Sequence, residues 1–290
     1  MTPQSSTLKV PGASLYYEMR GSGPVLLIIP GGPQDAGVFA DVAGHLADRY
    51  TVVAYDPRGN SRSTFDGEPQ EQDLNVHGDD AARLIEALGA GPAYVFGTSG
   101  GAQIGLNLAA RHPGRVRALV AHEPPSMMLL DDPSPSLAGM RDLHDTYRSQ
   151  GVEAAMQKFF SENGLSEGPD QGETGPHEPQ DGPPSFEPSP EEAETFARVS
   201  GNFEYWLAHG VMPLSLYHPD RGVARPPGRG RHRRRVRRPA DRRHGQGAGR
   251  QARQQARRLP RRPYGLCALS RPLRRDLAPD AQRRVRSSVQ

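Results

Sequence analysis

Short runs of consecutive apolar residues, separated by helix-like segments, set the strongest limit on what this chain can fold into. Three of these runs are residues 25–30 (VLLIIP), 51–56 (TVVAYD) and 93–99 (AYVFGTS). Strands that are apolar along their whole length are typical of parallel sheets, which helices cover on both faces. Residues 79–89 place apolar side chains on one helical face and end in a capping glycine. Strands that alternate with helices predict an α/β fold with a mostly parallel sheet.

The same pattern continues to residue 123. Residues 15–19 (LYYEM) predict a strand of an early hairpin, and residues 100–112 (GGAQIGLNLAARH) predict a helix. Residues 115–123 (RVRALVAHE) predict the next strand. We therefore expect residues 1–123 to form the α/β core, with the sheet intact through this strand.

Residues 124–220 predict a helical lid over the sheet. Residues 151–160 (GVEAAMQKFF) form an amphipathic pattern, and Ser189 to Glu192 give an N-cap, a first-turn proline and a reciprocal carboxylate. Residues 164–188, rich in Gly, Pro, Glu and Asp, predict a flexible acidic loop. The alternative is a helical extension with no role at the site. The helix after Ser189 is expected to bury one face made of Phe196, Val199, Phe203, Trp206 and Leu207.

Charge divides the chain into two unlike parts. Residues 221–290, called here the basic tail, contain 23 Arg, three Asp and neither Lys nor Glu, which gives a net charge near +20. Residues 1–220 carry a net charge near −17. The basic tail has no Phe or Trp, so it lacks the apolar surface that would offset the entropy of ordering it. We expect it to be disordered.

Composition also limits the compartment. Cys267 is the only cysteine, so no intramolecular disulfide can form. The first residues show no basic segment followed by an apolar one, and no apolar run approaches the length of a membrane span. We expect a cytoplasmic protein without membrane contact.

The motif that points most directly to a chemical reaction is Gly-x-Ser-x-Gly at residues 97–101. It lies between a predicted strand and a predicted helix. A turn this tight forces its central residue into a strained conformation and lifts the Ser99 hydroxyl above the sheet edge. At the start of the helix, the Gly100 N–H is placed to stabilise an oxyanion. The alternative is a glycine-rich turn that only packs a helix on a strand.

Two further motifs follow predicted strands. Residues 30–33 (PGGP) form a turn that offers the Gly32 N–H as a second oxyanion donor, and residues 55–63 (YDPRGNSRS) form another tight turn. In the order and spacing of these three motifs, residues 5–220 resemble the α/β-hydrolase superfamily, which includes esterases, haloalkane dehalogenases, haloperoxidase-like enzymes and proline iminopeptidases. One departure is that the usual His-Gly turn reads Pro30-Gly31 here.

The resemblance implies an enzyme that hydrolyses a small ester, amide or related bond through a covalent intermediate on Ser99. The substrate is then a small molecule, and neither a cofactor nor a metal is expected. Glu123, at the end of the strand after the nucleophile helix, is the candidate acid that orients a histidine, as in some haloalkane dehalogenases. Its alternative roles are to cap the start of the lid or to pair with an arginine. The turn at residues 30–33 also suggests a proline-iminopeptidase-like peptidase.

The family's catalytic histidine follows the last strand near the C-terminus, and none is identifiable here. The sequence after His244 contains no histidine and no apolar runs for two final strands. His122 is a poor base for Glu123, because adjacent side chains in a strand point to opposite faces. His209 and His218, in or after the lid helix, are expected at the surface.

A reading-frame shift near Asp220 would explain the basic tail, the absent strands and the absent histidine together. Arginine with proline, glycine and alanine is what a GC-rich gene gives out of frame, and residues 261–267 (RRPYGLC) read one base later permit Gly-Asp-His-Thr-Gly-Phe. We then expect the chain as written to be insoluble or nearly inactive. The alternative is a non-enzymatic polyanion-binding protein that uses the basic tail, which would contact nucleic acid through its charge, without sequence preference. Neither the exact substrate nor the oligomeric state is predicted.

Overall fold

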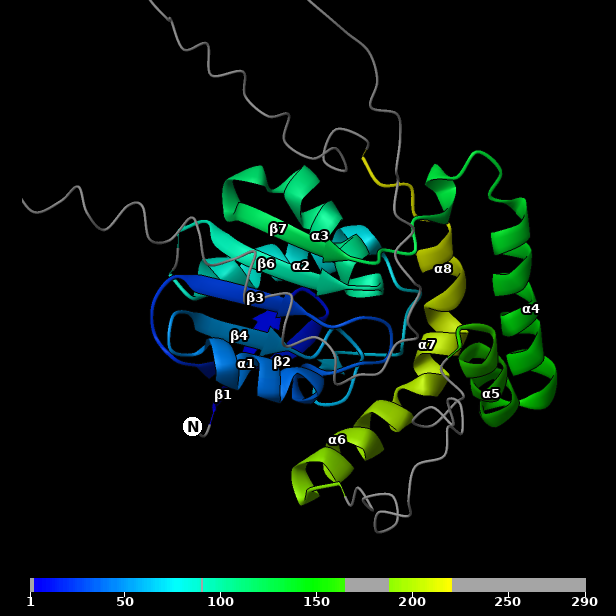
Figure 1. Cartoon of the computed structure of the whole chain (residues 1–290), viewed down its shortest axis with the longest axis horizontal. Helices are drawn as coiled ribbons and strands as arrows, with labels where there is room; N and C mark the ends of the chain where they lie inside the picture. Colours follow the sequence, from blue (N-terminus) through cyan, green and yellow to red (C-terminus); the bar gives the residue numbers. More distant parts are fainter. Residues whose placement is uncertain (1–2, 90, 165–187, 221–290) are drawn as a thin grey trace, which may run out of the picture.

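A computed structural model describes residues 3–89, 91–164 and 188–220 of the chain (Figure 1). The basic tail lies outside the described residues, and so does nearly all of the predicted acidic loop at 164–188. The expected disorder of both segments therefore stays a prediction.

The described residues contain one mixed sheet, and every strand predicted in the core is present. Along the sheet the order is β1-β2-β4-β3-β6-β7, with β5 paired to β2. The hairpin strands β1 and β2 are antiparallel, and β4, β3, β6 and β7 run parallel to one another. The strands are β1 (Gln4–Val10), β2 (Ala13–Arg20), β3 (Val25–Ile29), β4 (Thr51–Tyr55), β5 (Thr64–Phe65), β6 (Ala93–Thr98) and β7 (Val116–His122).

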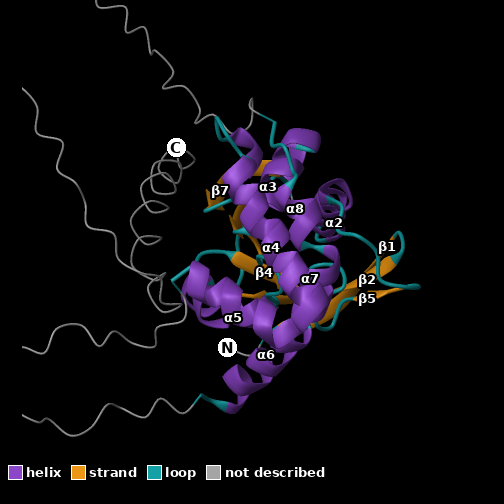
Figure 2. Cartoon of the chain, turned by 90° about the vertical axis from the view of Figure 1, so that its right-hand side faces the viewer, coloured by secondary structure: helices purple, strands orange, loops and turns teal. Residues whose placement is uncertain are grey.

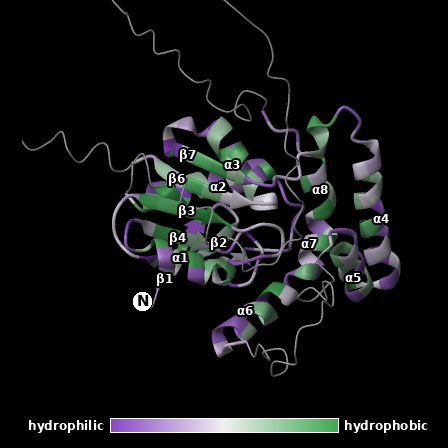
Figure 3. Cartoon of the chain, in the orientation of Figure 1, coloured by the Kyte–Doolittle hydropathy of each residue, from purple (hydrophilic) through white to green (hydrophobic). Residues whose placement is uncertain are grey.

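Burial on both faces explains why the central strands are apolar throughout. In β3, Leu26 and Ile28 join one core cluster, and Leu27 and Ile29 join the other. All four side chains are at most 3% exposed, and burying each contributes roughly 1.5–3 kcal/mol relative to leaving it in water. Figure 3 shows these apolar strands in the interior, between helices with mixed faces.

Helices cover the two faces unequally. Helix α1 (Ala40–Leu46) packs on one face, and α2 (Leu74–Ala87) and α3 (Gly100–Arg111) pack on the other. Helix α2 begins five residues before the predicted start, because the Asp73 carboxylate accepts from the Asn75 N–H and caps it. The glycine predicted to end this helix, Gly89, has the expected positive φ of 63°.

Strand β7 is the last strand of the sheet within the described residues. It pairs with β6 on one side, and Val120 on its α1-facing side is 41% exposed. Tyr94, Ala118 and Val120 line a small apolar hollow beside α1. The described sheet therefore ends in an apolar strand, as the sequence predicts.

Five helices form a separate layer, called here the helical layer, beyond one end of the sheet. In Figure 2 they lie in front of the sheet, seen from the right-hand side of Figure 1. The predicted amphipathic helix at 151–160 and the predicted capping box at Ser189 are both present. The helices are α4 (Ser134–Gln150), α5 (Val152–Glu162), α6 (Pro190–Gly201), α7 (Phe203–His209) and α8 (Val211–Ser215).

The predicted single helix after Ser189 is wrong in one respect. The chain bends at Asn202, which separates α6 from α7. Trp206 and Leu207 are buried as expected, whereas Phe196 on α6 is 73% exposed. Apolar spacing across both helices therefore does not define one buried stripe.

Candidate active site

The Gly-x-Ser-x-Gly turn joins β6 to α3, as the sequence predicts. Ser99 has φ 51° and ψ −123°, a sparsely populated backbone conformation that costs on the order of 1–3 kcal/mol, and the residue is exposed. Only glycine fits at position 101, because a Cβ there would lie 2.2 Å from the carbonyl oxygen of Ile29. This close approach between α3 and the end of β3 holds the serine at the sheet edge.

The turn after β3 lies directly against this serine. A Cβ on Gly31 would lie 2.9 Å from the Ser99 Cβ, so the turn needs glycine at this position too. The Gly31 carbonyl accepts from the Gln34 N–H at 3.0 Å. Since a trans peptide is planar, the Gly32 N–H points away from Gln34. The Gly32 nitrogen lies 3.2 Å from the position that a Cβ on Gly100 would occupy, so the two predicted donors are neighbours.

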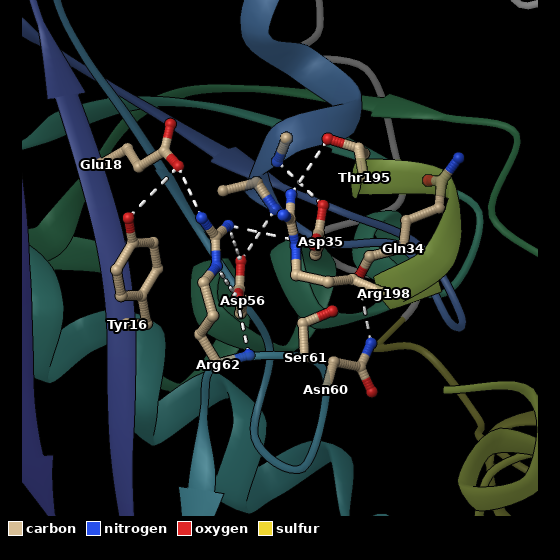
Figure 4. A network of polar contacts seen from close by, with 12 residues as sticks. Tyr16, Glu18, Gln34, Asp35, Asp56, Asn60, Ser61, Arg62, Thr195 and Arg198 are labelled. Atoms are coloured by element: carbon tan, nitrogen blue, oxygen red, sulfur yellow. Dashed lines mark hydrogen bonds and ion pairs between the residues drawn. The ribbon is translucent and has the colours of Figure 1, made fainter. Parts of the chain in front are cut away.

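The third motif, residues 55–63, forms a buried polar turn beside the second. The Asp56 carboxylate is fully buried and accepts from Arg62 Nε and the Arg62 N–H, at 2.8 and 3.0 Å, and from the Ala36 N–H at 2.9 Å. Arg62 also reaches Glu18 at 2.8 Å (Figure 4). Burial lowers the pKa of Arg62, but hydrogen bonds to Asp56 and Glu18 and the Asp56 charge outweigh it and raise the pKa overall. Arg62 is therefore a charged anchor for this turn.

The end of β7 meets the serine from the other side. The Ser99 N–H donates to the His122 carbonyl at 2.9 Å, so Glu123 follows immediately beside the turn. Glu123 has a positive φ of 52° and is exposed. The His122 ring contacts Thr98 Oγ1 at 3.3 Å and packs on Phe96, which belongs to the cluster on the α1 face.

Within the described ranges, no histidine nitrogen forms a hydrogen bond with the Ser99 hydroxyl. Two histidines of the helical region are engaged elsewhere: His209 lies 3.4 Å from a Glu71 oxygen, and His218 contacts the Pro219 carbonyl at 3.2 Å. His77 is fully buried in α2, and burial together with the Arg58 charge lowers its pKa to about 4. No catalytic base is therefore assigned within the described residues, and the missing base stays a prediction.

The helical layer reaches the serine turn through two apolar side chains. The Leu214 side chain lies 3.6 Å from the Cβ position of Gly100, and the Trp206 indole nitrogen lies 3.4 Å from that of Gly32. Gln103, fully buried in α3, donates to the Leu214 carbonyl at 3.0 Å. Trp206 and Leu214 therefore form part of the wall around the two N–H groups.

The sequence interpretation missed three residues that join the helical layer to the turn after β3. Asp35, Arg198 and Asn202 form ion pairs and hydrogen bonds across this boundary, as Figure 4 shows for the first two. Position 35 lies two residues after the predicted turn. The acidic residue there was the signal that the sequence offered for this contact. Its partner in the helical layer, Arg198, lies 163 residues away in the chain, and no local pattern points to it.

In residues 3–89, 91–164 and 188–220, no three His, Cys, Asp or Glu side chains come together as ligands for a metal ion. No helix in the same ranges is long and apolar enough to cross a membrane.

Comparison with known proteins gives a match to one family model. The model of the α/β-hydrolase fold family matches residues 24–163, which contain all three turns. The chain has the α/β-hydrolase fold, and over these residues it is similar to that family. The sheet order and the strand–serine–helix turn agree with that fold.

Two relatives illustrate how far the sequence similarity extends. The chain is 46% identical over 154 residues to the hydrolase YraK of Bacillus subtilis, across 52% of this chain and 57% of the relative. It is 37% identical over 108 residues to 2-(acetamidomethylene)succinate hydrolase of Mesorhizobium japonicum, across 37% of this chain and 38% of the relative. The matches therefore span between 38% and 57% of these relatives.

Solved structures share the fold at low identity. A hydrolase from Pseudomonas aeruginosa matches with a TM-score of 0.54 and 21% identity, across 74% of this chain and 73% of that one. The enol-lactonase from Burkholderia xenovorans matches with a TM-score of 0.53 and 16% identity, across 74% and 75%.

Proposed function

We propose that this chain derives from a serine hydrolase that cleaves a small ester, amide or related bond through a covalent intermediate on Ser99. The observation that carries the proposal is the conformation of Ser99, strained and exposed between β6 and α3. The Gly32 and Gly100 N–H groups beside it are the oxyanion donors of this proposal. The names of the relatives, all hydrolases, support the same class.

Glu123 is the proposed acid of the site. The bond from the Ser99 N–H to the His122 carbonyl brings the end of β7 to the serine turn, so a carboxylate at position 123 lies where it can orient a histidine supplied by the next part of the chain. In the described residues no histidine takes that place. We therefore propose that the chain as written lacks its base and is impaired, because its frame shifts near Asp220.

Labelling of the frame-restored protein with a fluorophosphonate probe tests the nucleophile. Ser99 is expected to be the modified residue when the labelled protein is mapped by mass spectrometry, and Ser99→Ala should abolish labelling. Ser126→Ala, which removes a serine hydroxyl on the loop after β7, is the matched control and should label as the parent does. Modification of another residue in place of Ser99 would overturn the assignment.

Substrate class is tested with a panel of p-nitrophenyl esters and prolyl amides on the frame-restored protein. Preference for esters supports the general hydrolase, and preference for prolyl amides supports the peptidase suggested by residues 30–33. The helical layer, with Trp206 and Leu214 against the oxyanion donors, is proposed to be the lid that sets this preference.

A binding protein that acts through the basic tail is the second candidate, favoured by its 23 arginines. Its charge would attract polyanions through counterion release, with steep salt dependence. A single aromatic residue, Tyr264, leaves little for base stacking, so the hydrolase is preferred.

A further inference from the structure

One buried carboxamide joins the helical layer to the turn after β3. This turn carries the Gly32 N–H and is called here the oxyanion turn. Asn202 is 5% exposed and lies at the bend between α6 and α7. Its Oδ1 accepts from the Ser61 N–H at 2.7 Å, and its Nδ2 donates to the Pro33 carbonyl and to Ser61 Oγ, both at 2.8 Å. A carboxylate could not make the two donations, so the amide group matches this place chemically.

The turn that Asn202 contacts is held from its other side by a second asparagine. Asn60, 1% exposed, donates from Nδ2 to the Gly32 carbonyl at 2.9 Å. The same group donates to the Gln34 carbonyl at 3.0 Å (Figure 4). With Asn202 on Pro33, three consecutive carbonyls have fixed partners. The backbone around the Gly32 N–H therefore depends on residues from two separate segments.

Asn202 also holds a strained residue in place. Ser61 has a positive φ of 47°, which is unfavourable for a residue with a side chain. Asn202 binds both the N–H and the hydroxyl of Ser61, and Asn60 is the adjacent residue. Asn202, between α6 and α7, thus supports the same turn that carries Asn60.

An ion pair one helical turn earlier acts on the same segment. Arg198 Nε lies 2.7 Å from the carboxylate of Asp35, which is fully buried and also accepts from the Gly37 N–H. Residues 198 and 202 lie four apart, so they share one side of the helix end. Both side chains face residues 33–35. The helical layer therefore contacts this segment at two points.

We propose that Asn202 is a positioning residue that couples the seating of the helical layer to the geometry of the oxyanion turn. The Gly32 N–H then holds its orientation only while α6 and α7 are docked. The catalytic consequence rests on the proposed function, but the coupling itself is a property of the fold.

Hydrogen–deuterium exchange of the full chain tests the coupling without any chemistry at Ser99. Asn202→Ala is expected to speed exchange in residues 31–38 at least about tenfold, because the turn loses its support, while β4 and α2 keep their protection. Asn107→Ala is the matched control: Asn107 is 4% exposed and bonds Asn75 between α2 and α3, away from the turn. Unchanged exchange in 31–38 for folded Asn202→Ala, or an equal rise in both variants, would overturn the coupling.

Asn202→Asp covers the case in which the alanine variant does not fold. It keeps the acceptor for the Ser61 N–H and loses the donation to Pro33, so exchange should rise in residues 31–35. No rise in that segment would count against the proposal just as plainly.

Phosphonylation kinetics of Ser99 in the frame-restored protein test the catalytic consequence. Asn202→Ala should lower the maximal labelling rate about tenfold and leave the half-saturating probe concentration within about twofold, because an oxyanion donor acts in the transition state. A variant that only destabilised the fold would change the maximal labelling rate and the half-saturating probe concentration together with stability. Asn107→Ala is the control for such an effect. If the frame-restored parent never labels Ser99, the proposed function fails, and the exchange result still decides the coupling.

Discussion

The Ser99 N–H donates to the His122 carbonyl at 2.9 Å, and this bond ties the serine turn to the end of β7. It joins the two adjacent strands β6 and β7 where both leave the sheet. The residue that follows, Glu123, is thereby fixed beside the nucleophile candidate, although 24 residues separate them in the chain.

Glu123→Gln separates an orienting acid from a surface residue. In a frame-restored protein, the substitution should lower kcat by about 10²–10⁴-fold, because the base loses the carboxylate that orients it. Steady-state turnover of a p-nitrophenyl ester measures this. In the chain as written, the same change should leave the residual rate within about twofold, since no base is present to orient. A large loss in both backgrounds would assign Glu123 another role.

Restoring the reading frame near codon 220 is expected to raise ester turnover by at least about 10³-fold, because the base and the missing strands return together. The exposed Val120 on β7 should then become covered, and soluble yield should increase. Sequencing the gene is the first check. Stop codons in the offset frame, or a frame without apolar strands and histidine, would refute the shift, and family-typical turnover by the chain as written would refute the missing base.

His77 makes stability depend on pH. In the folded chain its pKa is about 4, because burial and the Arg58 charge oppose protonation, whereas its ordinary value is 6.5. The unfolded chain therefore binds the proton first, and stability is lost as the pH falls from 6.5 toward 4. Between about pH 7 and about pH 5 the loss from this residue is roughly 2 kcal/mol.

Urea unfolding at the two pH values measures this loss. His77→Gln should flatten the pH dependence, and His45→Gln, which changes an exposed helical histidine, should keep the parent slope. An unaltered slope in His77→Gln would remove His77 as the cause.

Gly101→Ala tests the close packing that forms the serine turn. Its Cβ would lie 2.2 Å from the Ile29 carbonyl oxygen, so we expect a loss of about 1–3 kcal/mol despite the better helix propensity of alanine. Gly44→Ala in α1 is the matched control, since no atom lies within 4 Å of its Cβ position. That variant should gain up to about 1 kcal/mol. Thermal unfolding of both proteins gives the comparison, and equal shifts would contradict the packing argument.

The basic tail should bind polyanions without sequence preference. Deleting residues 221–290 is expected to abolish retention on heparin, and binding of the parent to DNA should weaken steeply with salt. Fluorescence anisotropy with two unrelated duplexes measures both affinity and selectivity. Selective binding that survives physiological salt would favour the binding-protein alternative.

The sequence determined the elements whose causes are local. The apolar runs at residues 25–30, 51–56 and 93–99 form buried strands. A strand that is buried on both faces needs consecutive apolar residues, and the sequence shows these directly. The capping box at Ser189 formed because its partners lie three residues apart. The strain at Ser99 was predictable for the same reason, since its glycine neighbours allow one tight turn.

Only the tertiary structure decided which distant residues support the site. Asn202 bonds Pro33 and Ser61 across at least 141 residues, and no periodicity or motif encodes such a pairing. The break between α6 and α7, which the sequence does not predict, lies at the same asparagine, and Phe196 on α6 is exposed. Hydrogen-bond partners of buried polar groups are set by how whole layers pack, so they become visible only when the layers are in place.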